Sequence, residues 1–245
     1  PKNISNPAEL SLLLLNDGQD LPKMPFDTLL NGLLEAGQIK PLLAVGIHAG
    51  KLRMQEYGTA KTLDYAGRGA KAEAYNQFVL ETLIPFVQAD YCIASFYQKA
   101  VAGFSLGGLT AIDMVWNYPD IFSIAGVFSG SLWWRTRDLD ADYNEETDRI
   151  MHQQVNGSKA QSSQRFYFTT GSLDETADRN GNGIIDSIDD TQDLIKVLKK
   201  SGVPARDISY VNYEDGKHDV ETWGRAMPDF LKWAWGRRTK TPIII

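Results

Sequence analysis

The sequence feature that most limits the possible folds is a serine between two glycines, in the segment Gly103-Phe104-Ser105-Leu106-Gly107. Residues 98–103 before it are typical of a short strand, and residues 107–117 after it have the apolar pattern of a helix. A serine at a strand-to-helix turn occupies a strained and crowded backbone, where glycine neighbours leave the space that the turn needs. The order strand, turn, helix is that of a nucleophile elbow, although an ordinary glycine-rich loop can contain the same five-residue pattern.

An elbow serine acts together with an acid and a histidine that follow it in the chain. Residues 165–170 form an aromatic and β-branched run typical of a buried strand, and Asp174 lies in the loop after it. The neighbouring Glu175 is the alternative acid, because either carboxylate could reach an imidazole. We therefore predict Asp174 as the acid and keep Glu175 open.

The base is predicted by elimination, because the chain has three histidines. His48 precedes the serine, and His152 lies in a polar insertion with no strand before it. Residues 207–213 alternate as a strand does, and the turn at 214–217 leads directly to His218. We predict His218 as the base, against the alternative of a surface histidine in a turn.

These residue types predict covalent acyl chemistry. Ser105 is a weak nucleophile at its free pKa, so His218 must remove its proton during attack, while Asp174 orients the imidazole ring. The tetrahedral oxyanion needs two donors, and the backbone N–H of Leu106 is the first. The apolar strand at 12–15 ends in a turn-forming segment, and we predict the N–H of Gln19 as the second donor.

The chain resembles the esterase branch of the α/β-hydrolases, which includes enterochelin, feruloyl and acetyl-xylan esterases, esterase D and mycolyltransferase relatives. The resemblance runs through residues 14–19, 42–47, 53–58, the elbow, 128–134 and 216–223. It implies the same nucleophile, acid, base and donors: Ser105, Asp174, His218, Leu106 and Gln19. Family members usually begin with further strands, so the resemblance also implies a catalytic domain cut from a longer protein. Many relatives lack the insertion at 175–191.

This insertion carries a second motif. Its residues follow the twelve-residue calcium loop in register, with Asp178, Asn180, Asn182, Ile184, Asp186 and Asp189 at the ligand positions and Gly183 at the bend. Ile184 would bind through its backbone carbonyl. The final Asp in place of Glu, and two Asn in place of Asp, predict modest affinity and a structural role. The alternative is a solvated acidic loop.

Strands and helices alternate throughout the 245 residues, which predicts a single α/β-hydrolase catalytic domain over 1–245. We expect a doubly wound, mostly parallel sheet with helices on both faces. The expected strands lie near 10–15, 42–47, 98–103, 123–128, 165–170 and 206–213, and the expected helices near 26–36, 71–88, 107–117, 190–200 and 219–235. This order brings Ser105, Asp174 and His218 to one edge of the sheet.

Three further residues are candidates for substrate binding. Trp133 and Trp134 follow a strand at the same edge and could wall an acyl or sugar pocket, although core burial is the alternative. Arg53 could contact a polar substrate, although a surface ion pair is the commoner outcome.

The net charge of −6 and the lack of a basic cluster argue against nucleic-acid binding. The apolar runs are too short to cross a membrane, the single Cys92 excludes internal disulfides, and no protein partner is evident. A calcium loop of modest affinity weakly favours an extracytoplasmic (periplasmic or secreted) location.

The predicted function is a serine esterase acting on a small-molecule or saccharide ester, of the feruloyl, acetyl-xylan or siderophore type. An acyltransferase that uses the same three residues is one alternative. The other is a calcium-dependent glycan-binding domain without catalysis.

Overall fold

The protein is described by a computed structural model over residues 9–161 and 163–237. A six-stranded sheet runs through the molecule in the order β2-β1-β3-β4-β5-β6. Its strands are β1 (Ser11–Asn16), β2 (Leu42–Ile47), β3 (Lys99–Phe104), β4 (Ile124–Phe128), β5 (Arg165–Leu173) and β6 (Ile208–Lys217). All five neighbouring pairs are parallel. The carboxyl ends of the strands therefore meet at one edge, where catalytic residues of α/β proteins gather.

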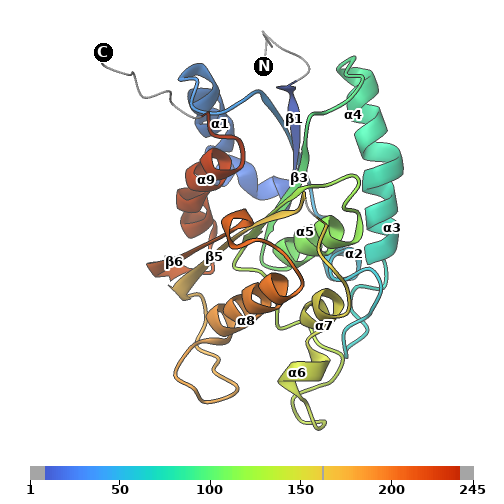
Figure 1. The fold of residues 1–245 in the computed structure, drawn as a ribbon, viewed down its shortest axis with the longest axis vertical. Helices are drawn as coiled ribbons and strands as arrows, with labels where there is room; N and C mark the ends of the chain where they lie inside the picture. Colours follow the sequence, from blue (N-terminus) through green and yellow to red (C-terminus); the bar gives the residue numbers. More distant parts are fainter. Residues whose placement is uncertain (1–8, 162, 238–245) are drawn as a thin grey trace.

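Helices cover both faces of the sheet (Figure 1). One face packs against α1 (Phe26–Glu35) and α9 (Val220–Trp235). The other packs against α5 (Leu106–Asn117), α7 (Ile150–Asn156), α8 (Asp186–Lys200) and one long helix made of α3 (Ala72–Gln77), the π-helical η3 (Phe78–Leu83) and α4 (Ile84–Asp90). Short helices η2 (Gly18–Lys23), α2 (Arg53–Glu56), α6 (Glu145–Asp148) and η4 (Ala205–Asp207) lie in the connections.

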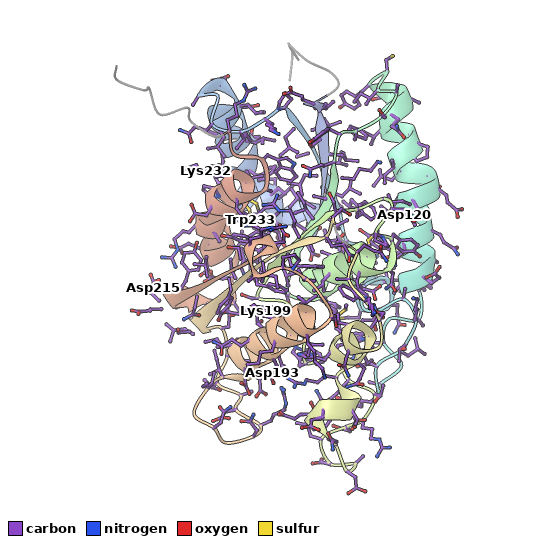
Figure 2. The ribbon with its side chains drawn as sticks, in the orientation of Figure 1. Asp120, Asp193, Lys199, Asp215, Lys232 and Trp233 are labelled. Carbon is purple, nitrogen blue, oxygen red and sulfur yellow. The ribbon has the colours of Figure 1, made fainter. Side chains whose placement is uncertain are left out.

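The two apolar cores follow from the period-two pattern of the strands. In β1, Leu12 and Leu14 point into the core under α5, while Leu13 and Leu15 point into the core under α1 and α9. All six residues of β1 are buried, as in a strand covered on both faces. Side chains fill the space between the layers on both sides (Figure 2).

The predicted doubly wound α/β-hydrolase fold is confirmed, with two local differences. Residues 214–217, expected as a turn, continue β6 in extended conformation up to Lys217. The helix expected at 190–200 begins four residues earlier, at Asp186. In the described part of the chain, no helix is long and apolar enough to cross a membrane.

Candidate active site

The elbow carries Ser105 on a strained backbone. Its φ of 54° and ψ of −121° are unusual for a residue with a side chain, and such strain is found at functional turns. A methyl group on Gly103 would lie 2.4 Å from the carbonyl oxygen of Gly107, so only glycine fits there. The Ser105 N–H donates to the carbonyl of Phe128 at 2.9 Å, which fixes the turn against the end of β4. Leu106 is the first residue of α5, where backbone N–H groups have no partner within the helix.

The candidate acid and base meet because β5 and β6 approach closely at their ends. A side chain on Gly171 would collide with the backbone of Gly216 at 2.4 Å, and each glycine lies a few residues before one of the two groups. His218 Nδ1 lies 3.9 Å from Asp174 Oδ1, which is within ion-pair distance but longer than a hydrogen bond. The Asp174 side chain is fully buried, whereas 39% of the His218 side chain is exposed.

The electrostatics favour a neutral imidazole at neutral pH. Burial lowers the pKa of His218 below its usual value, and the positive charge of Arg53 acts in the same direction. The carboxylate of Asp174 raises it, without reversing the net shift. A neutral imidazole can accept a proton, as a general base must.

The Asp174 carboxylate is held by one donor from the end of β5 and one from the loop after β4. The Gly171 N–H donates to Oδ2 at 2.9 Å, and the Ser129 hydroxyl donates to Oδ1 at 3.1 Å. Ser129 in turn accepts a hydrogen bond from Nε1 of Trp223 at 3.1 Å. The same indole packs edge-on against the His218 ring, with centroids 5.2 Å apart. Trp223 therefore contacts the base and, through Ser129, the acid.

Gln19, the predicted second oxyanion donor, lies in η2 directly after β1. Its side chain amide donates to Asp17 at 3.2 Å, and its carbonyl oxygen accepts the N–H of Ala49 at 2.9 Å. Asp17 has a left-handed φ of 59° and binds Arg53 through two contacts of 2.7 Å. Its N–H donates to the Tyr57 hydroxyl at 3.1 Å. These bonds fix the loop that carries Gln19.

This loop is joined to the elbow. The side chain amide of Asn16 donates to the carbonyl of Gly107 at 2.9 Å, and the Tyr75 hydroxyl donates to Asn16 Oδ1 at 2.5 Å. β1 and β3 are hydrogen-bonded neighbours in the sheet, so Gln19 and Ser105 both follow the carboxyl ends of adjacent strands.

A cavity of about 320 Å³ opens beside these groups. Its lining residues are Ser105, Ser129, Gly130, Ser131, Trp133, Asp174, Glu175, Ser187 and His218. The cavity brings the predicted nucleophile, acid and base together with the alternative acid, Glu175. The Ser131 hydroxyl lies 3.4 Å from that of Ser105, at the far limit of a hydrogen bond. A larger cavity of about 560 Å³ lies along α7 and α8 and includes none of the three predicted groups.

The three candidate substrate residues have different positions. Trp133 is half-buried and lines the cavity. Trp134 is fully buried and packs so closely on Gly58 that no side chain fits there, so it takes the core position that was its alternative. Arg53 lies outside the lining and forms the ion pair with Asp17, which was likewise its alternative.

The loop expected to bind calcium is held by its own polar groups. Asp178 accepts the N–H groups of Asn182 and Gly183, at 3.1 and 2.9 Å. Asp189 accepts the side chain amides of Asn180 and Asn182, at 2.8 and 3.1 Å. Among the described residues, no three His, Cys, Asp or Glu side chains converge as a metal site.

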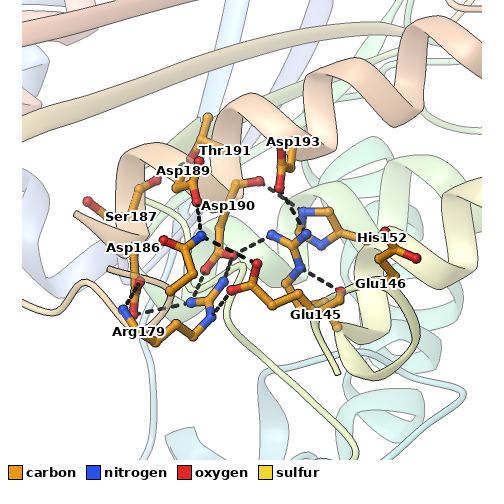
Figure 3. A network of polar contacts seen from close by, with 12 residues as sticks. Glu145, Glu146, His152, Arg179, Asp186, Ser187, Asp189, Asp190, Thr191 and Asp193 are labelled. Atoms are coloured by element: carbon orange, nitrogen blue, oxygen red, sulfur yellow. Dashed lines mark hydrogen bonds and ion pairs between the residues drawn. The ribbon is translucent and has the colours of Figure 1, made fainter. Parts of the chain in front are cut away.

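Asp186, the ligand expected at position nine of the calcium loop, already binds another residue of the protein. Asp186 accepts the N–H of Arg179 at 3.0 Å and lies 3.2 Å from its guanidinium. The same guanidinium contacts Glu145 and the buried Asp190, which also binds Arg149. The network shown in Figure 3 thus joins the loop to α6, α7 and α8 through buried ion pairs.

Sequence reasoning did not assign roles to Ser129, Ser131, Ser187 or Trp223. Ser129 and Ser131 directly follow β4, and a polar residue after a buried parallel strand was the available signal. Trp223 lies one helical turn into α9, five residues after His218. Ser187 gave no signal because the start of α8 was placed too late.

The sheet order, the elbow and the shared cavity define an α/β-hydrolase. The profile of the family described as "Putative esterase" matches residues 1–234, and the chain belongs to this family. It is thereby a member of a family of carboxylic-ester hydrolases.

Individual relatives show the same fold. The enterobactin esterase FES of Shigella flexneri is 22% identical with a TM-score of 0.68, over 92% of this chain and 52% of that one. The siderophore hydrolase EstA of Aspergillus nidulans is 16% identical with a TM-score of 0.69, over 94% and 84%. A curated relative, the siderophore triacetylfusarinine C esterase of Aspergillus fumigatus, is 29% identical over 85 residues, which are 34% of this chain. The match spans 29% of that relative, and this chain covers about half of the Shigella protein.

Proposed function

We propose that this chain is a serine esterase that hydrolyses a polar ester through an acyl-enzyme. The observation that carries the proposal is the strained Ser105 at the elbow, facing the same cavity as Asp174 and His218. Family membership supports ester hydrolysis as the reaction class.

In the first half-reaction, His218 accepts the hydroxyl proton as Ser105 Oγ attacks the ester carbon. The tetrahedral oxyanion takes hydrogen bonds from the N–H groups of Leu106 and Gln19. Collapse then breaks the ester bond, and His218 returns the proton to the departing alcohol. Asp174 keeps the ring oriented and stabilises the imidazolium between these transfers.

Water enters in the second half-reaction. His218 removes a proton from it, the hydroxide adds to the acyl-enzyme, and collapse releases the acid while Ser105 regains its proton. An alcohol in place of water gives an acyltransferase with the same residues. The His218 side chain, which lines the cavity, is 39% exposed, so water can reach it, which favours hydrolysis.

For the substrate, we propose a small polar ester, of the siderophore or sugar-linked type. Two of the relatives are a siderophore hydrolase and a siderophore esterase. Six of the nine residues that line the cavity carry a hydroxyl or a carboxylate, and Trp133 forms its aromatic wall. A purely aliphatic ester would leave these polar groups unpaired.

The first test compares the hydrolysis of p-nitrophenyl acetate and a feruloyl ester by the wild type and by Ser105→Ala. We expect turnover above background only in the wild type. Added alcohol acceptors, followed by product analysis, distinguish the hydrolase from the acyltransferase. Equal background rates for both proteins, together with calcium-dependent glycan binding, would instead favour the non-catalytic binding domain.

We also propose that the loop at 178–189 binds calcium with modest affinity in a structural role. Asn180 and Asn182 already lie within hydrogen-bond distance of Asp189, and rotation of an amide exchanges its nitrogen for its oxygen. A cation at their centre would then have oxygen ligands from three side chains in addition to Asp178. Asp186 would have to leave Arg179, which lowers the expected affinity.

Calorimetric titration of the metal-free protein with calcium tests this second proposal, with Asp178→Asn/Asp189→Asn as the variant. We expect binding in the wild type, a higher Tm with calcium than with EDTA, and neither effect in the variant. The absence of heat and of a Tm change in the wild type would contradict it. Because such a loop needs abundant calcium, we further propose an extracytoplasmic location.

A further inference from the structure

One part of the cavity lining is built from groups that the proposed chemistry does not use. Glu175 and Ser187 both line the cavity, and neither takes part in the proton transfers. Glu175 comes from the loop after β5, and Ser187 from the first turn of α8. We call these two residues the acidic wall.

Ser187 carries unused hydrogen-bonding capacity. Only 8% of the residue is exposed, and its hydroxyl has no hydrogen-bond partner among the described residues. The oxygen itself has almost no exposed surface. Because a buried hydroxyl without a partner costs free energy in the folded protein, a rotation of the side chain that brings this oxygen to a ligand in the cavity is favoured. Its side chain oxygen can both donate and accept.

Glu175 supplies negative charge to the same wall. Burial raises the pKa of its carboxyl above the usual value, and the backbone N–H of Ser187 opposes this shift by stabilising the charged form. A carboxylate offers about four acceptor sites, and this N–H uses one of them. The others are available to a donor in the cavity.

No lysine or arginine stands among the described residues that line the cavity. These nine residues include two carboxylates, Asp174 and Glu175. The one titratable nitrogen, on His218, has a lowered pKa and is neutral at pH 7. The guanidinium of Arg53 helps to lower the pKa of His218, and it is paired with Asp17. Asp174 is already held by two donors and faces His218, so Glu175 is the acceptor left for a ligand.

The aromatic wall does not offer a second cation site. The Trp133 ring has the guanidinium groups of Arg68 and Arg135 at 5.1 and 5.9 Å from its centroid. A third positive charge on this ring would be repelled. A cationic ligand group is therefore directed to the acidic wall instead.

We propose that Glu175 and Ser187 form a specificity subsite for a protonated amine within a few bonds of the ester that is cleaved. The ammonium donates to the Glu175 carboxylate and to the Ser187 hydroxyl, and the neutral isostere leaves both unpaired. This inference rests on the proposed esterase function and names the substrate class within it.

Turnover of matched esters is the first test. The acyl series compares p-nitrophenyl 6-aminohexanoate with p-nitrophenyl heptanoate, and the alcohol series compares 2-(dimethylamino)ethyl butyrate with 3-methylbutyl butyrate. We expect the wild type to prefer the amine in one series by about tenfold in kcat/KM, as one hydrogen bond to a charged group would give. Glu175→Gln should remove this preference, measured as the ratio of kcat/KM for the two esters within each variant.

Two variants control for other effects. Glu81→Gln removes the same charge from η3, outside the cavity, and should leave the preference unchanged. Ser187→Ala removes a hydroxyl with no partner in the fold, so it should reduce the preference without lowering Tm. A wild type with no preference in either series, or a preference that survives Glu175→Gln, would overturn the proposal.

A binding measurement separates this proposal from the proposed function. Ser105→Ala cannot turn esters over, so its Kd for methyl 6-aminohexanoate and for methyl heptanoate can be titrated directly. Tighter binding of the amine, lost in Ser105→Ala/Glu175→Gln, supports the subsite even if no ester is hydrolysed. Equal Kd values overturn it even if hydrolysis is fast.

Discussion

The hydroxyl of Ser129 connects Trp223 to Asp174: it accepts the indole N–H at 3.1 Å and donates to the carboxylate at 3.1 Å. The indole also packs against the ring of His218. Two loops and helix α9, which are far apart in the chain, are thus joined next to the candidate base. Ser129 and Trp223 therefore act as positioning residues for the acid and the base.

Ser129→Ala should lower kcat by about tenfold with little change in KM, because it removes one hydrogen bond to the Asp174 carboxylate and alters only one of the nine residues that line the cavity. Steady-state kinetics on p-nitrophenyl acetate checks this. Trp223→Phe is the comparison, since it removes the N–H together with part of the ring that packs against His218 and Phe104. It should have the smaller effect, and an equal or larger effect would show that packing of the ring dominates.

Activity should follow the protonation of His218. Because burial and Arg53 lower its pKa, kcat/KM should fall as the pH drops through an apparent pKa below 6.5 and stay level near pH 7. Arg53→Gln removes a positive charge that favours the neutral ring. The fall of kcat/KM on the acidic side of the pH profile should then occur at higher pH, and the activity at pH 6 should drop several-fold relative to that at pH 8.

Arg53→Lys keeps the charge and is the comparison for that profile. It should retain most of the wild-type profile on the acidic side, even though a lysine cannot reproduce both contacts to Asp17. If the acidic side of the pH–activity profile shifts equally in Arg53→Gln and Arg53→Lys, the shift comes from a change in the loop that carries Gln19 and not from the loss of charge.

The elbow glycine should not tolerate a methyl group. Gly103→Ala places a carbon against the Gly107 carbonyl, and we expect a loss of about 1–3 kcal/mol in the free energy of unfolding and a large loss of activity. Gly32 in α1 has open space around its α-carbon, so Gly32→Ala should stabilise the protein by about 0.5–1 kcal/mol. Urea denaturation measures both, and a neutral Gly103→Ala would contradict the close packing of the elbow.

Asp113 should make stability depend on pH in the direction opposite to most carboxyls. It is fully buried in α5, and burial raises its pKa to about 6. Between about pH 4 and pH 6 the folded protein holds a proton that the unfolded chain has released, so the free energy of unfolding falls as pH rises. The difference between 3.8 and about 6 corresponds to about 3 kcal/mol.

Asp113→Asn removes this titration and nearly preserves the shape of the side chain. Relative to the wild type, the variant should gain up to about 3 kcal/mol between pH 4 and pH 7. The comparison of the two proteins at each pH cancels the other titrating groups. Parallel stability curves would show that Asp113 does not titrate in this range.

The sequence was sufficient to predict the approximate positions of the six strands and that Ser105, Asp174 and His218 follow strands at one edge of the sheet, because both follow from local patterns. The buried run of β1, the elbow and the strand before Asp174 each have a period or composition that points to one structure. The sequence also indicated that His218 follows a strand, although β6 extends to Lys217 where a turn was expected.

The direction in which an individual side chain points could not be predicted from the sequence. Trp133 and Trp134 are adjacent and chemically identical, and only the packing of Gly58 decides that Trp134 faces the core. The choice between an ion pair and a substrate contact for Arg53 depended on the left-handed turn at Asp17, which brings its carboxylate within reach. Such choices are made by contacts between distant segments, which no local pattern encodes.

Covalent labelling of Ser105 is the most direct test of the proposed catalytic centre. The protein is treated with a fluorophosphonate, which reacts with activated serines, and the modified residue is located by mass spectrometry of its peptides. We expect a single adduct on Ser105, no adduct in Ser105→Ala, and strongly slowed labelling in His218→Ala, with Ser131→Ala labelled as the wild type is. Labelling of another serine, or equal labelling of Ser105 with and without His218, would contradict the proposed mechanism.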